Sequence, residues 1–146
     1  DGIIAYMVEF DFLPNPALDP DGSLNDRASA AARRGEKIFH RSFENMNGRS
    51  CADCHIPSSN FLDHKIHNIG SVEGPRPYSR DGAMDTPTLL GIRYTAPYFH
   101  DGSAATLQQV FQTGTTHNVF DTIDNSNLKA LIDFILALPD DTGNPD

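Results

Sequence analysis

The chain has 146 residues, of which 38% are hydrophobic and 21% are charged. This composition suits a single globular domain and excludes a chain that is disordered throughout. No apolar run approaches the ~20 residues that a membrane-spanning helix needs, so no membrane span is expected. The 11 Lys and Arg residues against 20 Asp and Glu residues give a net charge of −9. This charge argues against nucleic acid as a partner. It suits a basic protein partner, although many soluble proteins are simply acidic.

Residues 1–26 are expected to form a lead-in or linker, such as the end of a preceding domain. Prolines favour extended backbone in the second half of this segment. The acidic stretch around Gly22 is only faintly similar to a calcium-binding loop, because its glycine is misplaced for an EF-hand. We therefore expect a solvated turn there. Since Asp1 is not an initiator residue, a processed chain or a fragment is expected.

A first helix is expected over about 27–40, where Asp26 offers a good N-cap side chain. Within this helix, Gly35 would let another helix approach closely, at some cost in helix propensity. From 56 to 105 the chain is rich in proline and glycine. A loop-rich stretch of this length is unusual in a compact domain. It favours a bound group that takes the place of a side-chain core.

Two further helices are expected in the last third of the chain. Thr106 and Gln109 form a capping box in front of a short helix. Apolar residues from Leu128 to Leu138 follow i, i+3, i+4, i+7 spacing, which predicts a longer helix. We expect this last helix to cross the first one where Gly35 lies.

The two cysteines belong to Cys51-Ala52-Asp53-Cys54-His55, a C-x-x-C-H motif that is typical of covalent haem attachment. A thioredoxin-type redox pair would need a βαβ context, which the sequence does not predict. A zinc site would need two more ligands, for which His64 and His67 are close enough. A short disulfide is the remaining alternative.

The spacing of this motif matches the chemistry of haem c. Two thiols on one helical turn can each add to a vinyl group of the porphyrin. The next residue, His55, can then bind the iron from the proximal side. Cys51 and Cys54 would thereby become thioethers. Because such attachment takes place outside the cytoplasm, we expect a periplasmic or extracellular location.

Several short motifs follow one another along the chain: Gly35-x-x-x-Phe39, His67-Asn68-Ile69-Gly70, Thr86-Pro87-Thr88-Leu89-Leu90, Ala96-Pro97-Tyr98-Phe99-His100-Asp101-Gly102 and Ala105-Thr106-Leu107. Together with the C-x-x-C-H motif they resemble the C-terminal haem domain of bacterial di-haem cytochrome c peroxidases over residues 27–139. The resemblance implies an all-α, class I cytochrome c-like helical domain that is loop-rich and wrapped around one covalent haem. Residues 140–146 would then form a polar tail.

Two features depart from the family pattern. The peroxidases carry two haems and cleave peroxide at the N-terminal one, whereas this chain has one C-x-x-C-H motif. The family's C-terminal haem mainly stores and relays electrons. Its sixth iron ligand, a Met or Tyr, would fall at Thr113-Gly114 here, and neither residue is a good haem ligand.

The distal iron ligand therefore has several candidates. His117 comes first, because it lies about one helical turn beyond the family's position, in a loop that Gly114 makes deformable. Met84, just before Thr86, is the runner-up, and a place in a hydrophobic pocket wall is its alternative role. The other candidates are Met7, Met46, His64, His67, Tyr98 and His100. An iron without a distal ligand also stays open.

Other residues have expected roles around the haem. Arg93 and Arg80 suit pairing with haem propionates, although lone arginines suit the surface equally well. Tyr98 is expected to be a core residue or a propionate partner. His67 and His100 are expected to be structural, because buried histidines are more often hydrogen-bonded than ligating.

These features predict single-electron transfer through one covalent haem, with His55 as proximal ligand and His117 as distal ligand. The expected partner is a redox protein, and the chain alone is not expected to be an enzyme. One alternative is the electron-relay domain of a larger di-haem peroxidase or related oxidase, with a further haem domain or haem chain as partner. Another is a haem-based ligand-binding or sensor module.

Overall fold

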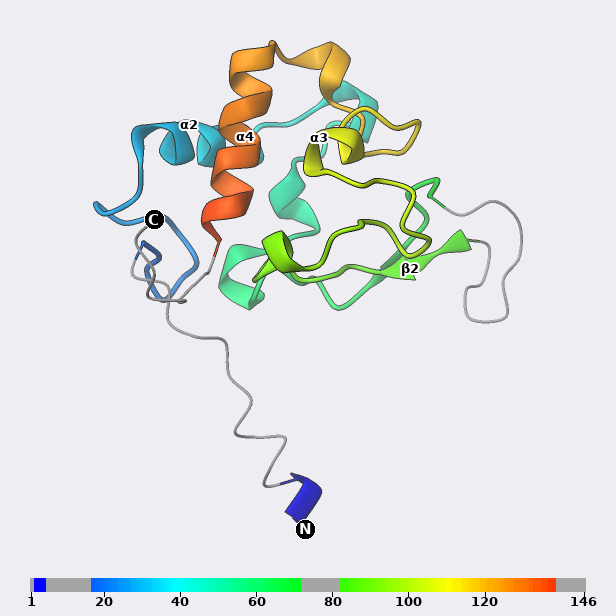
Figure 1. Ribbon diagram of the computed structural model, residues 1–146, viewed down its shortest axis with the longest axis horizontal. Coiled ribbons are helices and arrows are strands. Elements are labelled where there is room, and N and C mark those ends of the chain that lie inside the picture. Colours follow the sequence, from blue (N-terminus) through cyan, green and yellow to red (C-terminus); the bar gives the residue numbers. More distant parts are fainter. Residues whose placement is uncertain (1, 5–16, 72–81, 139–146) are drawn as a thin grey trace.

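The structure is a computed structural model that describes residues 2–4, 17–71 and 82–138 (Figure 1). Met7, Arg80 and the tail at 140–146 lie outside the described residues. The main helices are α2 (Ala30–Phe39), α3 (Leu107–Val110) and α4 (Asn125–Ala137). Strands β1 (Ile66–His67) and β2 (Met84–Asp85) form a short antiparallel pair, in which Ile66 lies opposite Asp85 and His67 opposite Met84. Single turns of 3₁₀ helix and loops make up most of the remaining described residues, as expected of a loop-rich helical domain.

Helix α2 begins later than its sequence suggested. The N-cap is Ser29, whose hydroxyl accepts a hydrogen bond from the backbone N–H of Ala32 at 3.0 Å. The prediction that Asp26 caps this helix is wrong. The Asn25 side chain instead accepts from the backbone N–H of Arg27 at 3.0 Å, which holds residues 25–28 in a turn before the helix.

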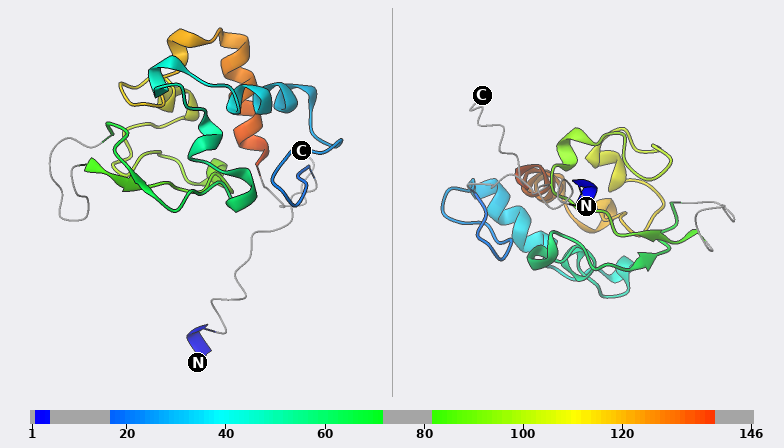
Figure 2. Two further views of the ribbon diagram at one scale, coloured as in Figure 1. Left: turned by 180° about the vertical axis from the view of Figure 1, so that it is seen from behind. Right: turned by 90° about the horizontal axis from the view of Figure 1, so that it is seen from below.

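The predicted crossing of the first and last helices is confirmed (Figures 1 and 2). A Cβ atom added at Gly35 would overlap the Ala130 carbonyl of α4, so only glycine allows this approach. The rings of Phe39 and Phe134 pack with their centroids 5.0 Å apart. Leu131 has no exposed surface. At this crossing, side chains of the two helices therefore pack directly on one another.

Both C-terminal helices start at side-chain caps. The carboxylate of Asp124 accepts from the backbone N–H of Asn127 at 2.8 Å and caps α4. The predicted capping box of α3 is confirmed, since Thr106 accepts from the Gln109 N–H and the Gln109 side chain accepts from the Thr106 N–H. The short α3 is thus fixed at the base of the loop that carries His117.

The segment 17–26 packs against the helical domain. The backbone N–H of Leu24 donates to the Glu36 carboxylate on α2 at 2.8 Å, and Leu18 and Leu24 contact the core. Gly22, with φ of +83°, forms the turn that the sequence predicted. The loops that follow α2, together with those of residues 82–123, lie on the other side of the helix pair (Figure 1). They enclose the site described next.

Candidate haem-binding site

A cavity of about 590 Å³ lies between the helix pair and the loops. Its walls are mostly apolar and come from residues between Phe39 and Ile135. Phe39, Leu107 and Ile135 contribute from the three helices, and Phe99 and Val119 from the loops. The polar lining residues include Cys51, Cys54, His55 and His117.

A single turn presents the C-x-x-C-H motif to this cavity. The 3₁₀ helix η2 (Cys51–Asp53) begins at Ser50, whose backbone N–H donates to the Asp53 carboxylate at 2.7 Å. The backbone N–H of His55 donates to the Cys51 carbonyl at 2.9 Å. Three functional side chains therefore enter the cavity from one tight turn, as haem attachment requires.

The two thiols remain protonated in this environment. Both cysteines are free, so the disulfide alternative has no support in the structure. Burial raises the pKa of Cys51 to about 12, and it also raises the pKa of Cys54. Both side chains are therefore neutral where they line the apolar cavity.

The imidazole of His55 is oriented by a backbone contact. Its Nδ1 lies 3.3 Å from the Phe61 carbonyl oxygen. Such a hydrogen bond fixes the tautomer of a metal-binding histidine and leaves Nε2 free to ligate. Burial lowers the pKa of His55, which keeps the ring neutral. The arrangement suits a proximal haem ligand.

His117 faces His55 across the cavity. The two ring centroids are 6.3 Å apart. Since a metal–imidazole bond is about 2.0–2.1 Å long, two imidazoles on opposite sides of one metal ion have centroids about 6 Å apart. Burial and the neighbouring His55 lower the pKa of His117 to about 4, so this ring is neutral as well. The residues present therefore fit a haem iron held between two histidines.

Nδ1 of His117 is buried and has no hydrogen-bond partner among the residues that the structure describes. The ring packs against Phe99, with centroids 6.1 Å apart. The backbone N–H of His117 donates to the Thr115 hydroxyl at 3.2 Å, and the Thr116 N–H donates to the Ile69 carbonyl at 3.0 Å. Backbone contacts and apolar packing hold the ring in place, without a polar partner like that of His55.

The other candidates separate into two groups. Five of them also line the cavity, namely Met46, His67, Met84, Tyr98 and His100. His64 instead lies 3.2 Å from the Ser59 hydroxyl in an exposed loop. Arg93 does not line the cavity, and its guanidinium donates to the Leu136 carbonyl at 3.0 Å. Thr113 and Gly114 line a smaller polar cavity of about 470 Å³ beside the main one.

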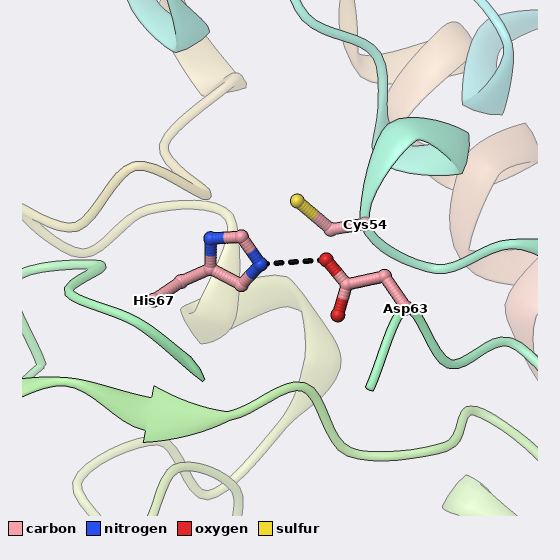
Figure 3. Close-up of side chains that lie close together, drawn as sticks. All are labelled: Cys54, Asp63 and His67. Carbon is pink, nitrogen blue, oxygen red and sulfur yellow. Dashed lines mark hydrogen bonds and ion pairs between the residues drawn. The ribbon is translucent and has the colours of Figure 1, made fainter. Parts of the chain in front are cut away.

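The sequence reasoning missed Asp63, which lies beside Cys54 and His67, two residues of the cavity wall (Figure 3). One potential ligand atom from each of the three lies within 4.8 Å of the others. A structural zinc site normally has four ligands, and Cys54 is already committed to the C-x-x-C-H motif. The four-residue spacing between Asp63 and His67 was the one signal in the sequence that could have indicated this pair.

The fold and the cavity define a cytochrome-like domain built to hold haem. The family model for di-haem cytochrome c peroxidase matches residues 29–137, and the chain belongs to this family. Membership implies haem c as the cofactor and confirms the resemblance carried by the sequence motifs. In the part of the chain that the structure describes, no helix is long and apolar enough to cross a membrane.

Similar proteins come from two bacteria. The gamma subunit of hydrazine synthase from Kuenenia stuttgartiensis is 26% identical, and the match covers 94% of this chain and 48% of the subunit. Cytochrome c551 peroxidase from Nitrosomonas europaea is 30% identical over 47% of this chain and 24% of its own length. A solved structure of K. stuttgartiensis hydrazine synthase under xenon has a TM-score of 0.61 at 25% identity, covering 93% of this chain and 54% of that one. These matches span about half the length of the relatives or less.

Proposed function

We propose that the chain is a c-type cytochrome domain that transfers single electrons through one covalently attached haem. Cys51 and Cys54 form the thioethers, His55 is the proximal ligand and His117 is the distal ligand. The observation that carries this proposal is the pair of neutral imidazoles, 6.3 Å apart between ring centroids, in a cavity that both cysteines line. Bound haem would supply one-electron chemistry through its iron.

The protein's contribution is ligation, shielding and rigidity. Two nitrogen ligands leave no vacant position on the iron, which suits an electron carrier and excludes substrate binding at the metal. The apolar walls keep water away and lower the local dielectric constant. Because α2 and α4 pack directly on each other, the side of the cavity formed by Phe39 and Ile135 changes little when the iron changes its charge.

The test is the optical and low-temperature EPR spectrum of the ferric haem-loaded protein beside three variants. We expect a low-spin signal of two histidine ligands that His117→Ala converts to a high-spin signal or to another ligand set. His64→Ala removes an exposed histidine outside the cavity and should leave the spectrum unchanged. Met84→Ala should also leave it unchanged. A spectrum that responds to Met84→Ala and not to His117→Ala would contradict the assignment.

A second candidate function rests on the span of the matches. The chain corresponds to about half of the hydrazine synthase gamma subunit, as one haem domain of a two-haem protein would. In this case the domain relays electrons to a second haem domain, within a larger peroxidase or related oxidase. A second C-x-x-C-H motif in the full-length gene would support the relay role. Rapid peroxide turnover by the single-haem chain would contradict both the relay role and the electron-carrier proposal.

A third candidate, a ligand sensor, rests on the unpartnered Nδ1 of His117. A histidine without a second hydrogen bond is a weaker ligand than one with such a bond, so a small gas molecule could displace it. Carbon monoxide binding to the ferrous protein, seen as a change in the optical spectrum, would favour this function. A ferrous spectrum that carbon monoxide does not change favours the electron carrier.

The proposal also includes a cellular setting. Covalent haem attachment places the domain, residues 27–139 with the packed segment 17–26, in the periplasm or outside the cell. Its partner is a redox protein, and the net charge of −9 suits a basic one. Electron exchange with such a partner should slow markedly as salt is raised from 10 to 200 mM, because salt screens exposed charges over about 10 Å at 0.1 M.

A further inference from the structure

The carboxylate of Asp63 is buried beside Cys54 and His67, two residues that line the haem cavity. Its side chain is only 3% exposed, whereas Asp85, the acidic residue that lines the cavity in the described part of the chain, is exposed. Figure 3 shows Asp63 beside the Cys54 sulfur and the imidazole of His67. An isolated buried carboxylate would be costly, so the surrounding donors decide whether this one is charged.

Three groups supply hydrogen bonds to this carboxylate. Nε2 of His67 donates to Oδ2 at 2.6 Å, and the backbone N–H of Lys65 donates to Oδ1 at 3.1 Å. The Thr86 hydroxyl contributes a further bond. Burial alone would raise the pKa of Asp63, but these bonds outweigh it and lower the pKa to about 2. Asp63 is therefore an ionised carboxylate at neutral pH, even though it lies inside the protein.

We propose that the buried charge of Asp63, held in place by His67, lowers the reduction potential of the haem in this domain. The proposal rests on the electron-transfer function proposed above. A negative charge beside the haem favours the ferric iron, which carries one more positive charge than the ferrous iron. The hydrogen-bond partners of the Asp63 carboxylate are His67, Lys65 and Thr86, and not the two histidines proposed as iron ligands. Its charge would therefore act on the iron through space and set the potential.

Burial makes this charge more effective than the neighbouring surface charges. Coulomb energies are about four times larger at an effective dielectric constant of about 20 than in bulk water. Asp85 provides the comparison, because it lines the same cavity from β2 but its side chain is exposed. Neutralising Asp63 should therefore shift the potential several-fold more than neutralising Asp85.

The experiment is a redox titration at pH 7 of haem-loaded wild type, Asp63→Asn, Asp85→Asn and His67→Gln. We expect Asp63→Asn to raise the potential and Asp85→Asn to change it by less than half as much. His67→Gln keeps a donor toward Asp63 and leaves its charge in place, so the potential should stay the same or fall. If disturbed packing admitted water, the reduction potentials of Asp63→Asn and His67→Gln would shift in the same direction. If the charge of Asp63 sets the potential, only Asp63→Asn has a higher potential than wild type.

Equal potentials for wild type and Asp63→Asn, or equal shifts for Asp63→Asn and Asp85→Asn, would overturn the proposal. If Asp63→Asn does not fold, His67→Gln decides alone. A higher potential then overturns the proposal, and an unchanged or lower one supports it. EPR spectra of the same samples distinguish a failure of the proposed electron-transfer function from a failure of the proposed role of Asp63. A wild type without two nitrogen ligands contradicts the proposed function, whereas low-spin variants with equal potentials contradict only the role of Asp63.

Discussion

The α2–α4 pair and the loop-built wall of the cavity are stabilised by different kinds of contact. In the helix pair, Phe39, Leu131 and Phe134 are in direct contact, and each is at most 1% exposed. Across the cavity, residues such as Phe99 and His117 face a space of about 590 Å³. The comparison indicates that side chains alone hold the first region together, while the second needs the cofactor to complete its packing.

Removing the haem should have the largest effect, because it should destabilise the loop-built wall of the cavity more than the α2–α4 pair. An empty apolar cavity of this size would cost on the order of 10 kcal/mol, comparable to the whole stability of a domain. In a Cys51→Ala/Cys54→Ala variant that binds no haem, we expect residues 82–123 to lose protection from amide exchange, while α2 and α4 keep more of theirs. Haem-loaded wild type is the reference, measured by hydrogen exchange with mass spectrometry. Equal loss of protection in both regions would show that the helix pair also depends on haem.

Truncating one aromatic ring in the α2–α4 pair and one in the loop-built wall should give the next largest effect on stability. Phe134 is 1% exposed and packs against Phe39, so Phe134→Ala should destabilise the protein by about 3–5 kcal/mol. Phe99 is half-buried and borders the cavity. We expect Phe99→Ala to cost less than half as much in urea denaturation of the haem-loaded protein. Similar costs for the two variants would mean that the loops pack as tightly as the helices.

A matched pair of glycine substitutions tests the close approach of the helices. A Cβ at Gly35 would overlap the Ala130 carbonyl, whereas a Cβ at Gly114 would meet nothing within 4 Å. Gly35→Ala gains about 1 kcal/mol of helix propensity, but we expect the clash to leave a net loss of about 2 kcal/mol. Gly114→Ala should stay within about 0.5 kcal/mol of wild type. Thermal unfolding measures both, and a neutral Gly35→Ala would show that α4 can move away freely.

The two regions also differ in how much the sequence could reveal. The apolar spacing from Leu128 to Leu138 and the glycine at 35 were enough to predict the helix crossing, because both are local patterns with one packing solution. Asp26 was wrongly predicted as N-cap because residues 25–28 form a turn and the helix begins at Ser29 instead. Sequence spacing could not show which of the two side chains, Asp26 or Ser29, caps the helix.

The site shows the same limit. The C-x-x-C-H motif indicates its ligands locally, since Cys51, Cys54 and His55 share one turn. That His117 lies opposite His55 depends on a loop tied to Ile69 by a backbone bond, which no spacing reveals. Asp63 was missed because an aspartate in a polar stretch normally lies in water. Only the folded loops bury it beside Cys54.

Removing helix caps should have the smallest effects on stability. The EPR spectra of the cap variants should separate the two regions better than their free energies of unfolding do. Thr106→Ala and Asp124→Ala each remove one N-cap bond, so each should cost about 1 kcal/mol. Thr106 caps the single turn of α3, which leads into the loop of His117, whereas Asp124 caps α4 near the point where Arg34 of α2 bonds to Ser126. We expect Thr106→Ala to change the ferric EPR signal and Asp124→Ala to leave it as it is, at equal loss of stability. If both variants change the signal equally, the iron environment depends on the stability of the whole domain, and the loop has no separate control over its ligand.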